Sequence, residues 1–169
     1  GTLGDAALGL ALVRRPLAAF EMRLLSHHCD EVMARYDRPQ PRLALAPLLI
    51  AHASASMDLS DGLLKDAGRM AAASGVRLAF PATALPLSAA MTRALDANAS
   101  RLTDIVAHGD DYEVLCAVPE ARVAAFLKDA QALPFRVTEI GTVAKGKGAA
   151  ILDATGAEIP FDRTGWDHF

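Results

Sequence analysis

The chain is organised around the stretch Ser56-Met57-Asp58-Leu59-Ser60-Asp61-Gly62-Leu63-Leu64-Lys65-Asp66. Residues 53–57 are predicted to form a short buried strand. The apolar residues that follow Gly62 recur at the spacing of one helical face, which predicts a helix that ends at Gly75. Asp58 and Asp61 therefore fall at a corner between a strand and a helix.

This corner, residues 58–62, has two possible roles. Asp58, Asp61 and the hydroxyl of Ser60 lie beside the positive end of the predicted helix, which suits magnesium and the phosphates that it carries. Alternatively, Ser60 or Asp61 only caps the helix and Asp58 is a solvated strand end, because Ser and Asp are common capping residues. The corner alone leaves both interpretations open.

The composition is that of a globular protein. The chain has 169 residues, of which 52% are hydrophobic, and a formal net charge of −3. This length can bury a sizeable core and suits about one domain or one and a half. The small net charge gives no indication of a nucleic-acid face, so no nucleic-acid partner is expected. The longest apolar run, residues 43–51, is interrupted by Pro47 and is too short to span a bilayer, so no membrane partner is expected either.

Two further features concern the location of the protein. Cys29 and Cys116 form neither a CxxC motif nor a disulfide framework, which fits a reducing cytoplasm. The chain begins at Gly1 without an initiator methionine and without a visible secretory leader. We therefore expect a cytoplasmic protein of which this chain is a fragment.

Helices and strands are mixed along the rest of the chain. A long amphipathic helix is predicted for residues 17–35, and two prolines then impose an extended connector, residues 36–42. Further helices are predicted over residues 43–53, 88–98, 103–107 and 119–133, and strands over residues 76–80, 112–118, 135–144 and 149–152. The Gly/Lys turn at residues 145–148 favours a hairpin over half of a phosphate-binding loop, because it lacks the final Ser/Thr and a following helix.

The second informative region is the acidic turn, residues 108–113, which reads His108-Gly109-Asp110-Asp111-Tyr112-Glu113. Its three carboxylates repel one another and raise each other's pKa values unless cations, hydrogen-bond donors or solvent surround them. We therefore expect a cationic partner for this turn. An acidic surface turn is the simple alternative.

The tail, residues 165–169, is rich in aromatic rings. It reads Gly165-Trp166-Asp167-His168-Phe169. Because chain ends are usually polar, this tail is expected to dock on the body of the protein or on a ligand.

Four stretches, in this order and spacing, together resemble the thiamine-monophosphate kinase family. They are the connector Tyr36-x-Arg38-Pro39-x-Pro41-Arg42, the corner Met57-Asp58-Leu59-Ser60-Asp61-Gly62-Leu63, the acidic turn with Gly109-Asp110-Asp111-Tyr112-Glu113-Val114-Leu115, and the tail. The resemblance covers essentially the whole chain, with residues 1–10 as a leading helix, but only the C-terminal half of that enzyme. One departure is that the family's acidic turn usually begins Gly-Gly-Glu-Asp-Tyr-Glu, so the shorter Asp110 stands in place of a glutamate.

The resemblance implies an α+β fold with a mixed, largely antiparallel sheet packed with helices, as in the C-terminal domain of aminoimidazole ribonucleotide synthetase-like proteins. It divides the chain into residues 1–38, helices that link from a missing N-terminal domain, and residues 39–169, the C-terminal α+β domain. The full-length protein is expected to be a homodimer.

The activity that the resemblance implies is the ATP-dependent phosphorylation of thiamine monophosphate to thiamine diphosphate. Asp58 and Asp61 would bind Mg²⁺, and Ser60 would contact the phosphates of ATP. Asp110 and Trp166 would face the thiamine substrate, because a carboxylate and an aromatic face suit a cationic thiazolium or an aminopyrimidine ring. No separate catalytic side chain is expected, since the acceptor phosphate is already an anionic nucleophile.

Two alternative functions fit parts of the sequence. A related ATP-using enzyme, such as selenophosphate synthetase or the purine enzyme, fits the corner but is disfavoured by the acidic turn and the tail together. A non-catalytic domain that binds a ligand or assembles with a partner also fits, because a site divided between two domains cannot work when one is absent. The isolated chain is therefore expected to be inactive alone.

Overall fold

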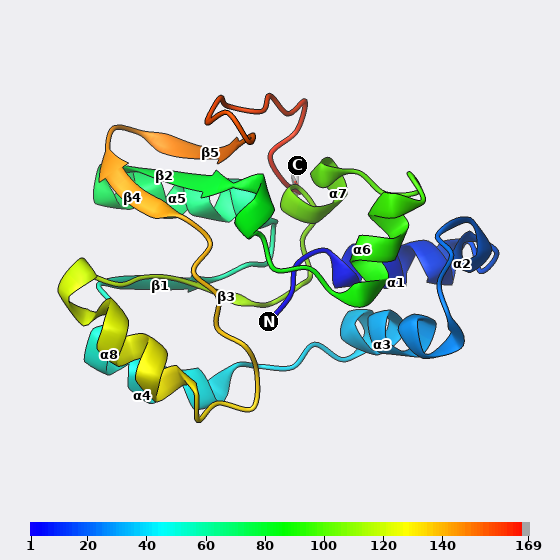
Figure 1. Cartoon of the computed structure of the whole chain (residues 1–169), viewed down its shortest axis with the longest axis horizontal. Helices are drawn as coiled ribbons and strands as arrows, with labels where there is room; N and C mark the ends of the chain where they lie inside the picture. Colours follow the sequence, from blue (N-terminus) through cyan, green and yellow to red (C-terminus); the bar gives the residue numbers. More distant parts are fainter. Residues whose placement is uncertain (167–169) are drawn as a thin grey trace.

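The computed structural model describes residues 1–166 and contains two small β-sheets with helices packed around them (Figure 1). The helices are α1 (Asp5–Arg14), α2 (Ala18–Glu21), α3 (Ser26–Asp37), α4 (Ala46–His52), α5 (Leu63–Ser74), α6 (Ala89–Asp96), α7 (Leu102–Val106) and α8 (Glu120–Ala130), with short 3-10 turns η1 (Leu43–Leu45) and η2 (Ala82–Ala84). The strands are β1 (Ala55–Asp58), β2 (Val76–Pro81), β3 (Val114–Ala117), β4 (Thr142–Lys145) and β5 (Gly148–Leu152). The predicted α+β class is confirmed.

The strands pair in a mixed and mainly antiparallel way, as predicted, but they form two sheets instead of one. In the first sheet β1 and β3 are antiparallel, with Asp58 opposite Val114. In the second sheet β2 lies between β4, which is antiparallel to it, and β5, which is parallel. Because β1 ends where β3 begins, the first sheet brings the corner and the acidic turn side by side.

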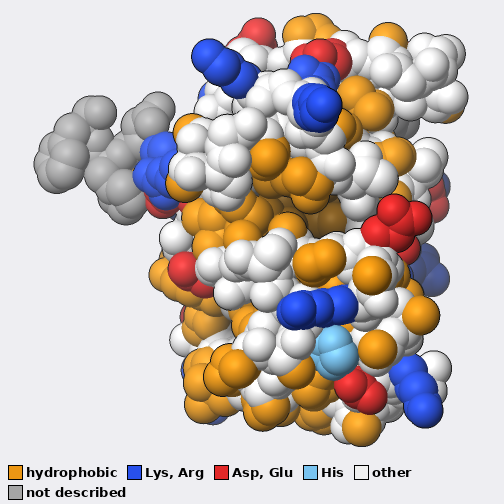
Figure 2. Space-filling model, turned by 90° about the vertical axis from the view of Figure 1, so that its left-hand side faces the viewer, with side chains coloured by type: hydrophobic (Ala, Val, Ile, Leu, Met, Phe, Trp, Pro, Cys, Tyr) orange, Lys and Arg blue, Asp and Glu red, His pale blue; other side chains and the backbone are white. Residues whose placement is uncertain are grey.

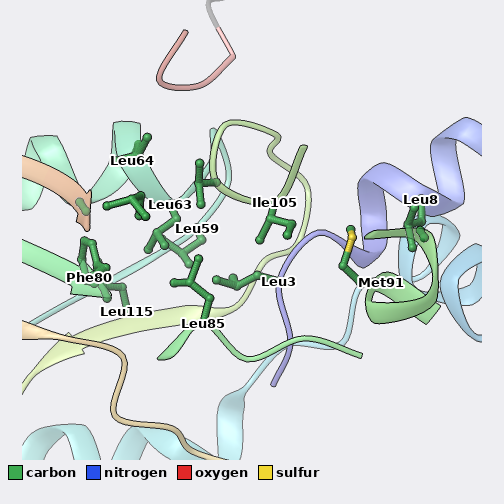
Figure 3. Close-up of a cluster of buried hydrophobic side chains, with 14 of the residues drawn as sticks. Leu3, Leu8, Leu59, Leu63, Leu64, Phe80, Leu85, Met91, Ile105 and Leu115 are labelled. Atoms are coloured by element: carbon green, nitrogen blue, oxygen red, sulfur yellow. The ribbon is translucent and has the colours of Figure 1, made fainter. Parts of the chain in front are cut away.

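Helix α5 is the predicted helix that follows the corner. Leu63, its first residue, is buried, and Gly75 ends the helix in the left-handed conformation with a φ of 63°. Figure 3 shows Leu59, Leu63, Phe80 and Leu115 within one cluster of buried side chains. These residues come from the corner, α5, β2 and β3. Leu59 therefore anchors the corner in the hydrophobic core.

The predicted single helix over residues 17–35 is wrong, because the chain turns between α2 and α3. Arg23 has a positive φ of 53° in this turn. Met22 and Leu24 both pack against the hydrophobic core. Residues two apart on one continuous helix point about 200° apart, so the turn is needed to direct both side chains inward. Helices α1, α3 and α6 lie together at the same end of the molecule (Figure 1).

The predicted hairpin between the last two strands is also wrong. Strands β4 and β5 both pair with β2 and not with each other, and Val76 lies opposite Lys145. The turn at residues 146–147 therefore crosses the end of β2. Leu78 and Phe80 are buried within β2. Their burial explains why this apolar strand takes the central position and is paired on both sides.

The other elements lie near their predicted positions, with smaller differences. The strand predicted at residues 53–57 is β1, which begins two residues later and alternates between half-buried and exposed residues instead of being fully buried. The strand predicted at residues 135–144 is limited to β4. The division of the chain at residue 38 stays a prediction. Among residues 1–166, no helix has the length and apolar character needed to cross a membrane.

Candidate active site

The start of α5 is capped by Asp66, a residue inside that helix. Oδ2 of Asp66 accepts hydrogen bonds from the backbone N–H groups of Ser60 (3.0 Å), Asp61 (2.9 Å) and Gly62 (3.2 Å). The residue that precedes α5 is Gly62, which has no capping side chain. The exposed position of Asp58 at the end of β1 agrees with the simple alternative for that residue. This role of Asp66 was not predicted from the sequence, although an acidic residue in the first turn of a helix is a common stabilising feature.

The capping by Asp66 limits what the corner can offer to a phosphate. Three backbone N–H groups that could bind an anion are already hydrogen-bonded to this carboxylate. The groups that the corner can present are the side chains of Asp58, Ser60 and Asp61. Asp58 ends β1 and is exposed, Ser60 is half-buried, and Asp61 is buried.

Two cations of α5 lie next to the Asp61 carboxylate. Oδ2 of Asp61 is 2.6 Å from Nη1 of Arg69 and 3.6 Å from Nζ of Lys65. The same Nη1 of Arg69 is 2.9 Å from Oδ1 of Asp66. The hydrogen bond to Asp61 is the main cause of a raised pKa at Arg69, so this guanidinium stays charged. Neither cation was predicted from the sequence, although Lys65 lies four residues after Asp61 and Arg69 three residues after Asp66, spacings that are typical of ion pairs.

The acidic turn runs alongside the corner and is joined to it by backbone hydrogen bonds. The N–H of Leu59 donates to the carbonyl of Glu113 (2.8 Å), and the N–H of Tyr112 donates to the carbonyl of Leu59 (3.0 Å). The N–H of Asp110 donates to the carbonyl of Ser60 (3.1 Å). These bonds fix the two segments relative to each other.

The close contact between the two segments strains the acidic turn. A Cβ at Gly109 would lie 2.0 Å from the carbonyl oxygen of Ser60, so only glycine fits there. Asp110 and Tyr112 have positive φ values of 69° and 50°, which are uncommon for residues other than glycine. Strain of this kind is often found at functional sites, where the surrounding structure holds it in place.

The negative charges of three predicted site residues act on one phenol, that of Tyr112. The pKa of Tyr112 is raised, first by the negative charge of Asp110, then by burial, and also by the charges of Asp58 and Asp61. Asp58 and Asp110 are exposed to solvent. The structure therefore brings carboxylates from the corner and the acidic turn together at the surface.

Asp111 points away from this surface, into the protein. Its Oδ2 accepts a hydrogen bond from the N–H of Gly4 (2.6 Å) and its Oδ1 accepts one from the N–H of Ala6 (3.2 Å), so it caps the start of α1. Burial outweighs these bonds and raises the pKa of Asp111 to about 7. This residue therefore serves the packing of α1 and not the exposed carboxylate group.

Glu113 has the cationic partners that were predicted for the acidic turn. Its Oε1 is 2.5 Å from Nη2 of Arg35 and 2.5 Å from Nη2 of Arg42, and its Oε2 accepts a bond of 2.8 Å from Nε of Arg42. Burial alone would raise the pKa of Glu113, but the hydrogen bond from Arg42 and the positive charges around it outweigh burial and lower that pKa. The connector is thereby tied to the acidic turn through Arg42.

The first two residues of the tail, Gly165 and Trp166, lie against the corner. The N–H of Trp166 donates to the carbonyl of Asp61 (3.0 Å), and Nζ of Lys65 donates to the carbonyl of Trp166. The Trp166 side chain is 58% exposed. The expected docking of the tail is confirmed for the backbone of this residue, while its indole remains accessible. Residues 167–169 lie outside the described residues.

The side chains of the corner fit a magnesium ion as a partial set of ligands. Mg²⁺ is usually held by one or two carboxylates together with substrate phosphates and waters, and Asp58 and Asp61 supply two carboxylates. The charges of Asp110, Asp58 and Asp61 all raise the pKa of Tyr112, in agreement with negative charge at this place. Within residues 1–166, no group of three or more His, Cys, Asp or Glu side chains is placed to hold a metal ion by itself. Further ligands would have to come from phosphates, water or another segment.

A large apolar cavity lies between the two sheets, apart from the exposed carboxylates. Its volume is about 850 Å³. Figure 2 shows hydrophobic side chains gathered around a hollow on one face of the molecule. The side chains that line the cavity include Leu78, Phe80, Leu115, Phe126 and Val143. None of the predicted metal, nucleotide or substrate residues lines it. An apolar lining does not suit phosphates, so the candidate site is at the corner.

Known proteins resemble this chain in sequence and in structure. The family model of AIR synthase related protein, C-terminal domain, matches residues 1–153. The thiamine-monophosphate kinase of Caulobacter vibrioides is 34% identical over 99% of this chain and 46% of its own length. The solved thiamine-monophosphate kinase of Stenotrophomonas maltophilia is 33% identical, with a TM-score of 0.76 over 89% of this chain and 48% of its own. AaThiL complexed with AMPPCP and TMP is 30% identical, with a TM-score of 0.77 over 100% of this chain and 49% of its own. The chain thus spans about half the length of the curated relatives it matches.

Proposed function

Since the chain belongs to the family of AIR synthase related proteins through their C-terminal domain, we propose that it is the C-terminal part of an ATP-dependent thiamine-monophosphate kinase. The observation that carries this proposal is the meeting of the corner, the acidic turn and Trp166 at one place on the surface. The relatives that bear this name support it, because they align with the whole chain or nearly all of it. AaThiL supports the substrates, because it was solved with TMP and AMPPCP, an analogue of ATP.

The proposed reaction moves a phosphoryl group from ATP to the phosphate of thiamine monophosphate. An oxygen of that phosphate forms a bond to the γ-phosphorus of ATP, and the bond between the γ-phosphorus and its bridging oxygen to the β-phosphorus breaks, leaving ADP. The acceptor is already an anion, so the reaction needs no strong base. It needs accurate positioning and neutralisation of the phosphate charges.

The corner serves the phosphates in this proposal. Asp58 and Asp61 hold Mg²⁺, which neutralises phosphate charge when it is bound. Ser60 contacts the nucleotide phosphates through its hydroxyl, because its N–H is already bonded to Asp66. The fully buried Asp66 accepts hydrogen bonds from the backbone N–H groups of Ser60, Asp61 and Gly62 and so holds this loop in place.

The acidic turn and the tail serve the thiamine substrate. Asp110 is exposed, and its backbone is held in a strained conformation by the corner. The indole of Trp166 is exposed, and its backbone is bonded to Asp61. The backbones of the two residues are bonded to neighbouring residues of the corner, Ser60 and Asp61. A carboxylate and an aromatic face suit a cationic thiazolium ring.

The test of this proposal is Asp58→Asn, made in a protein that carries this chain together with the N-terminal portion present in its relatives. We expect turnover of ATP and thiamine monophosphate to fall by at least about a hundredfold, the scale of lost charge stabilisation in a transition state. Asp96→Asn, at an exposed position in α6, is the matched control and should keep normal turnover. A near-normal rate for Asp58→Asn would overturn the metal role.

The second candidate is a non-catalytic domain that binds a ligand or assembles with a partner. The length of the relatives favours it for the chain in isolation, since the chain covers only about half of them. We propose that the N-terminal part of the same enzyme supplies the rest of the site, in a cytoplasmic homodimer. The purified chain should then show no turnover of ATP with thiamine monophosphate, and measurable thiamine diphosphate would contradict this.

A further inference from the structure

We infer that Arg69 is a built-in counter-ion of Asp61 and competes with a divalent cation for that carboxylate. This inference rests on the proposed metal role of Asp61 and adds a residue that controls it. Arg69 thus sets how tightly the corner binds the cation.

The geometry places the Arg69 guanidinium where a cation would bind. Its Nη1 is 2.6 Å from Oδ2 of Asp61, which is the distance of a strong, charged hydrogen bond. A magnesium ion would bind a carboxylate oxygen at about 2.0–2.1 Å. A guanidinium and a magnesium ion on the same carboxylate bring like charges within a few ångströms, so one weakens the other.

Asp66, the second carboxylate that Arg69 contacts, is held firmly in place. The same Nη1 is 2.9 Å from Oδ1 of Asp66. Asp66 is fully buried, and its other oxygen accepts three backbone N–H groups of the corner. Asp66 therefore keeps its position and three of its hydrogen bonds if Arg69 moves away from Asp61.

Arg69 itself is free to leave this position. Its side chain is 51% exposed, whereas the Asp61 side chain is only 8% exposed. Because half of the Arg69 side chain is exposed, its guanidinium can donate hydrogen bonds to water when it leaves the carboxylate. The buried Asp61 carboxylate, by contrast, needs positive charge beside it. Lys65, 3.6 Å from its Oδ2, supplies one such charge, and Arg69 or a divalent cation supplies another. Exchange between Arg69 and a divalent cation satisfies both conditions.

The test is the binding of Mg²⁺ alone to the 169-residue chain, measured by isothermal titration calorimetry. Arg69→Gln should lower the Kd for Mg²⁺ about two- to fivefold, the size of an exposed ion pair's contribution. Arg69→Met keeps the length of the side chain without its charge and should have the same effect. Arg69→Lys keeps the charge and should stay closer to the original Kd. Arg77→Gln, in the exposed pair with Glu158, is the control and should not change the Kd.

The same measurements on Asp61→Asn and on the double variant Asp61→Asn/Arg69→Gln distinguish the proposed metal role of Asp61 from the competing role of Arg69. Asp61→Asn should weaken Mg²⁺ binding, and Arg69→Gln should then have no further effect, because the carboxylate for which it competes is gone. Normal binding by Asp61→Asn would overturn the proposed metal role, and the inference with it. A different outcome would overturn only the inference about Arg69. In that outcome Asp61→Asn weakens Mg²⁺ binding, while Arg69→Gln and Arg69→Met leave the Kd unchanged or raise it. No detectable binding by any of these proteins would also overturn the inference.

Discussion

Glu113 is the residue that ties the connector to the acidic turn, and its substitution has a predictable cost. Its side chain is buried between Arg35 and Arg42, which are themselves largely buried. Glu113→Gln should lower the free energy of unfolding by about 3 kcal/mol, because it leaves two arginines without their counter-charge. Urea unfolding followed by circular dichroism measures this change.

The exposed pair between Arg77 and Glu158 is the matched control for this prediction. It has the same N–O distance of 2.5 Å as the pair between Arg42 and Glu113. Glu158→Gln should nevertheless change the free energy of unfolding by less than about 1 kcal/mol, since solvent screens exposed charges. Equal effects of the two substitutions would contradict the role given to the burial of Glu113.

Asp111 makes the stability of the protein depend on pH. Burial raises its pKa from 3.8 to about 7, so the folded state binds the proton more tightly than the unfolded state. The stabilisation from this proton is fully present below pH 3.8 and is lost as the pH rises through about 7. Asp111→Asn does not titrate. The stability of the original chain relative to this variant should therefore fall between those two pH values, by up to about 1.4 kcal/mol per pH unit. Urea unfolding of both proteins at several pH values tests this, and a constant difference would contradict it.

Residues of the candidate site were predictable from the sequence where their side chains suggest a chemical role. They were not predictable where their role depends on the three-dimensional packing. The carboxylates of the corner and the acidic turn are conspicuous in the sequence, and backbone hydrogen bonds join the two segments in the structure. The sequence does not reveal that Asp66 closes the helix or that Arg69 holds Asp61. These roles depend on the three-dimensional turn of the corner, although helical spacing from known acids gives a usable signal.

At the scale of elements, helix α5 offers two glycines whose substitution should have opposite effects. Gly68 lies within the helix and nothing lies within 4 Å of a Cβ added there, so Gly68→Ala should stabilise the protein by about 0.5–1 kcal/mol. Gly75 has equal space but a φ of +63°, so Gly75→Ala should destabilise it by about 1 kcal/mol or more. Each kcal/mol corresponds to about 2–4 °C in the melting temperature. Thermal unfolding of the two variants tests whether the backbone conformation, and not the space around the added Cβ, decides if the substitution stabilises or destabilises the protein.

Helices and strands were predictable where local sequence signals mark their ends, and not where their bounds depend on contacts with distant segments. Helices α5 and α6 were expected close to their observed bounds, because Gly75 and the capping Ser88 mark an end and a start. The helix predicted over residues 17–35 and the final hairpin failed because both depended on distant partners. The first breaks so that Met22 and Leu24 reach the core, and the second is displaced by the pairing of both strands with β2. Local patterns do not contain this information.

At the scale of the whole molecule, the candidate site depends on the pairing of β1 with β3. That pairing joins two segments that are far apart in the sequence, and it places the corner next to the acidic turn. The family resemblance predicted that the two segments lie together, whereas the spacing of residues did not. Helix α5 and Asp66 then fix the corner on one side, and Arg42 with Glu113 fixes the acidic turn on the other.

The surface of the whole molecule predicts self-association of the isolated chain. Leu17 and Phe20 are 83% and 89% exposed, and Val13 is 50% exposed, so three large apolar side chains face solvent within a short segment. Contiguous exposed apolar surface favours association, because contact removes it from water. Multi-angle light scattering should therefore show an average mass that rises with concentration. Phe20→Ser should reduce this rise, while Ile50→Ser, at a separate site that is 86% exposed, should leave it nearly unchanged. A monodisperse monomer at high concentration would show that these side chains do not drive association.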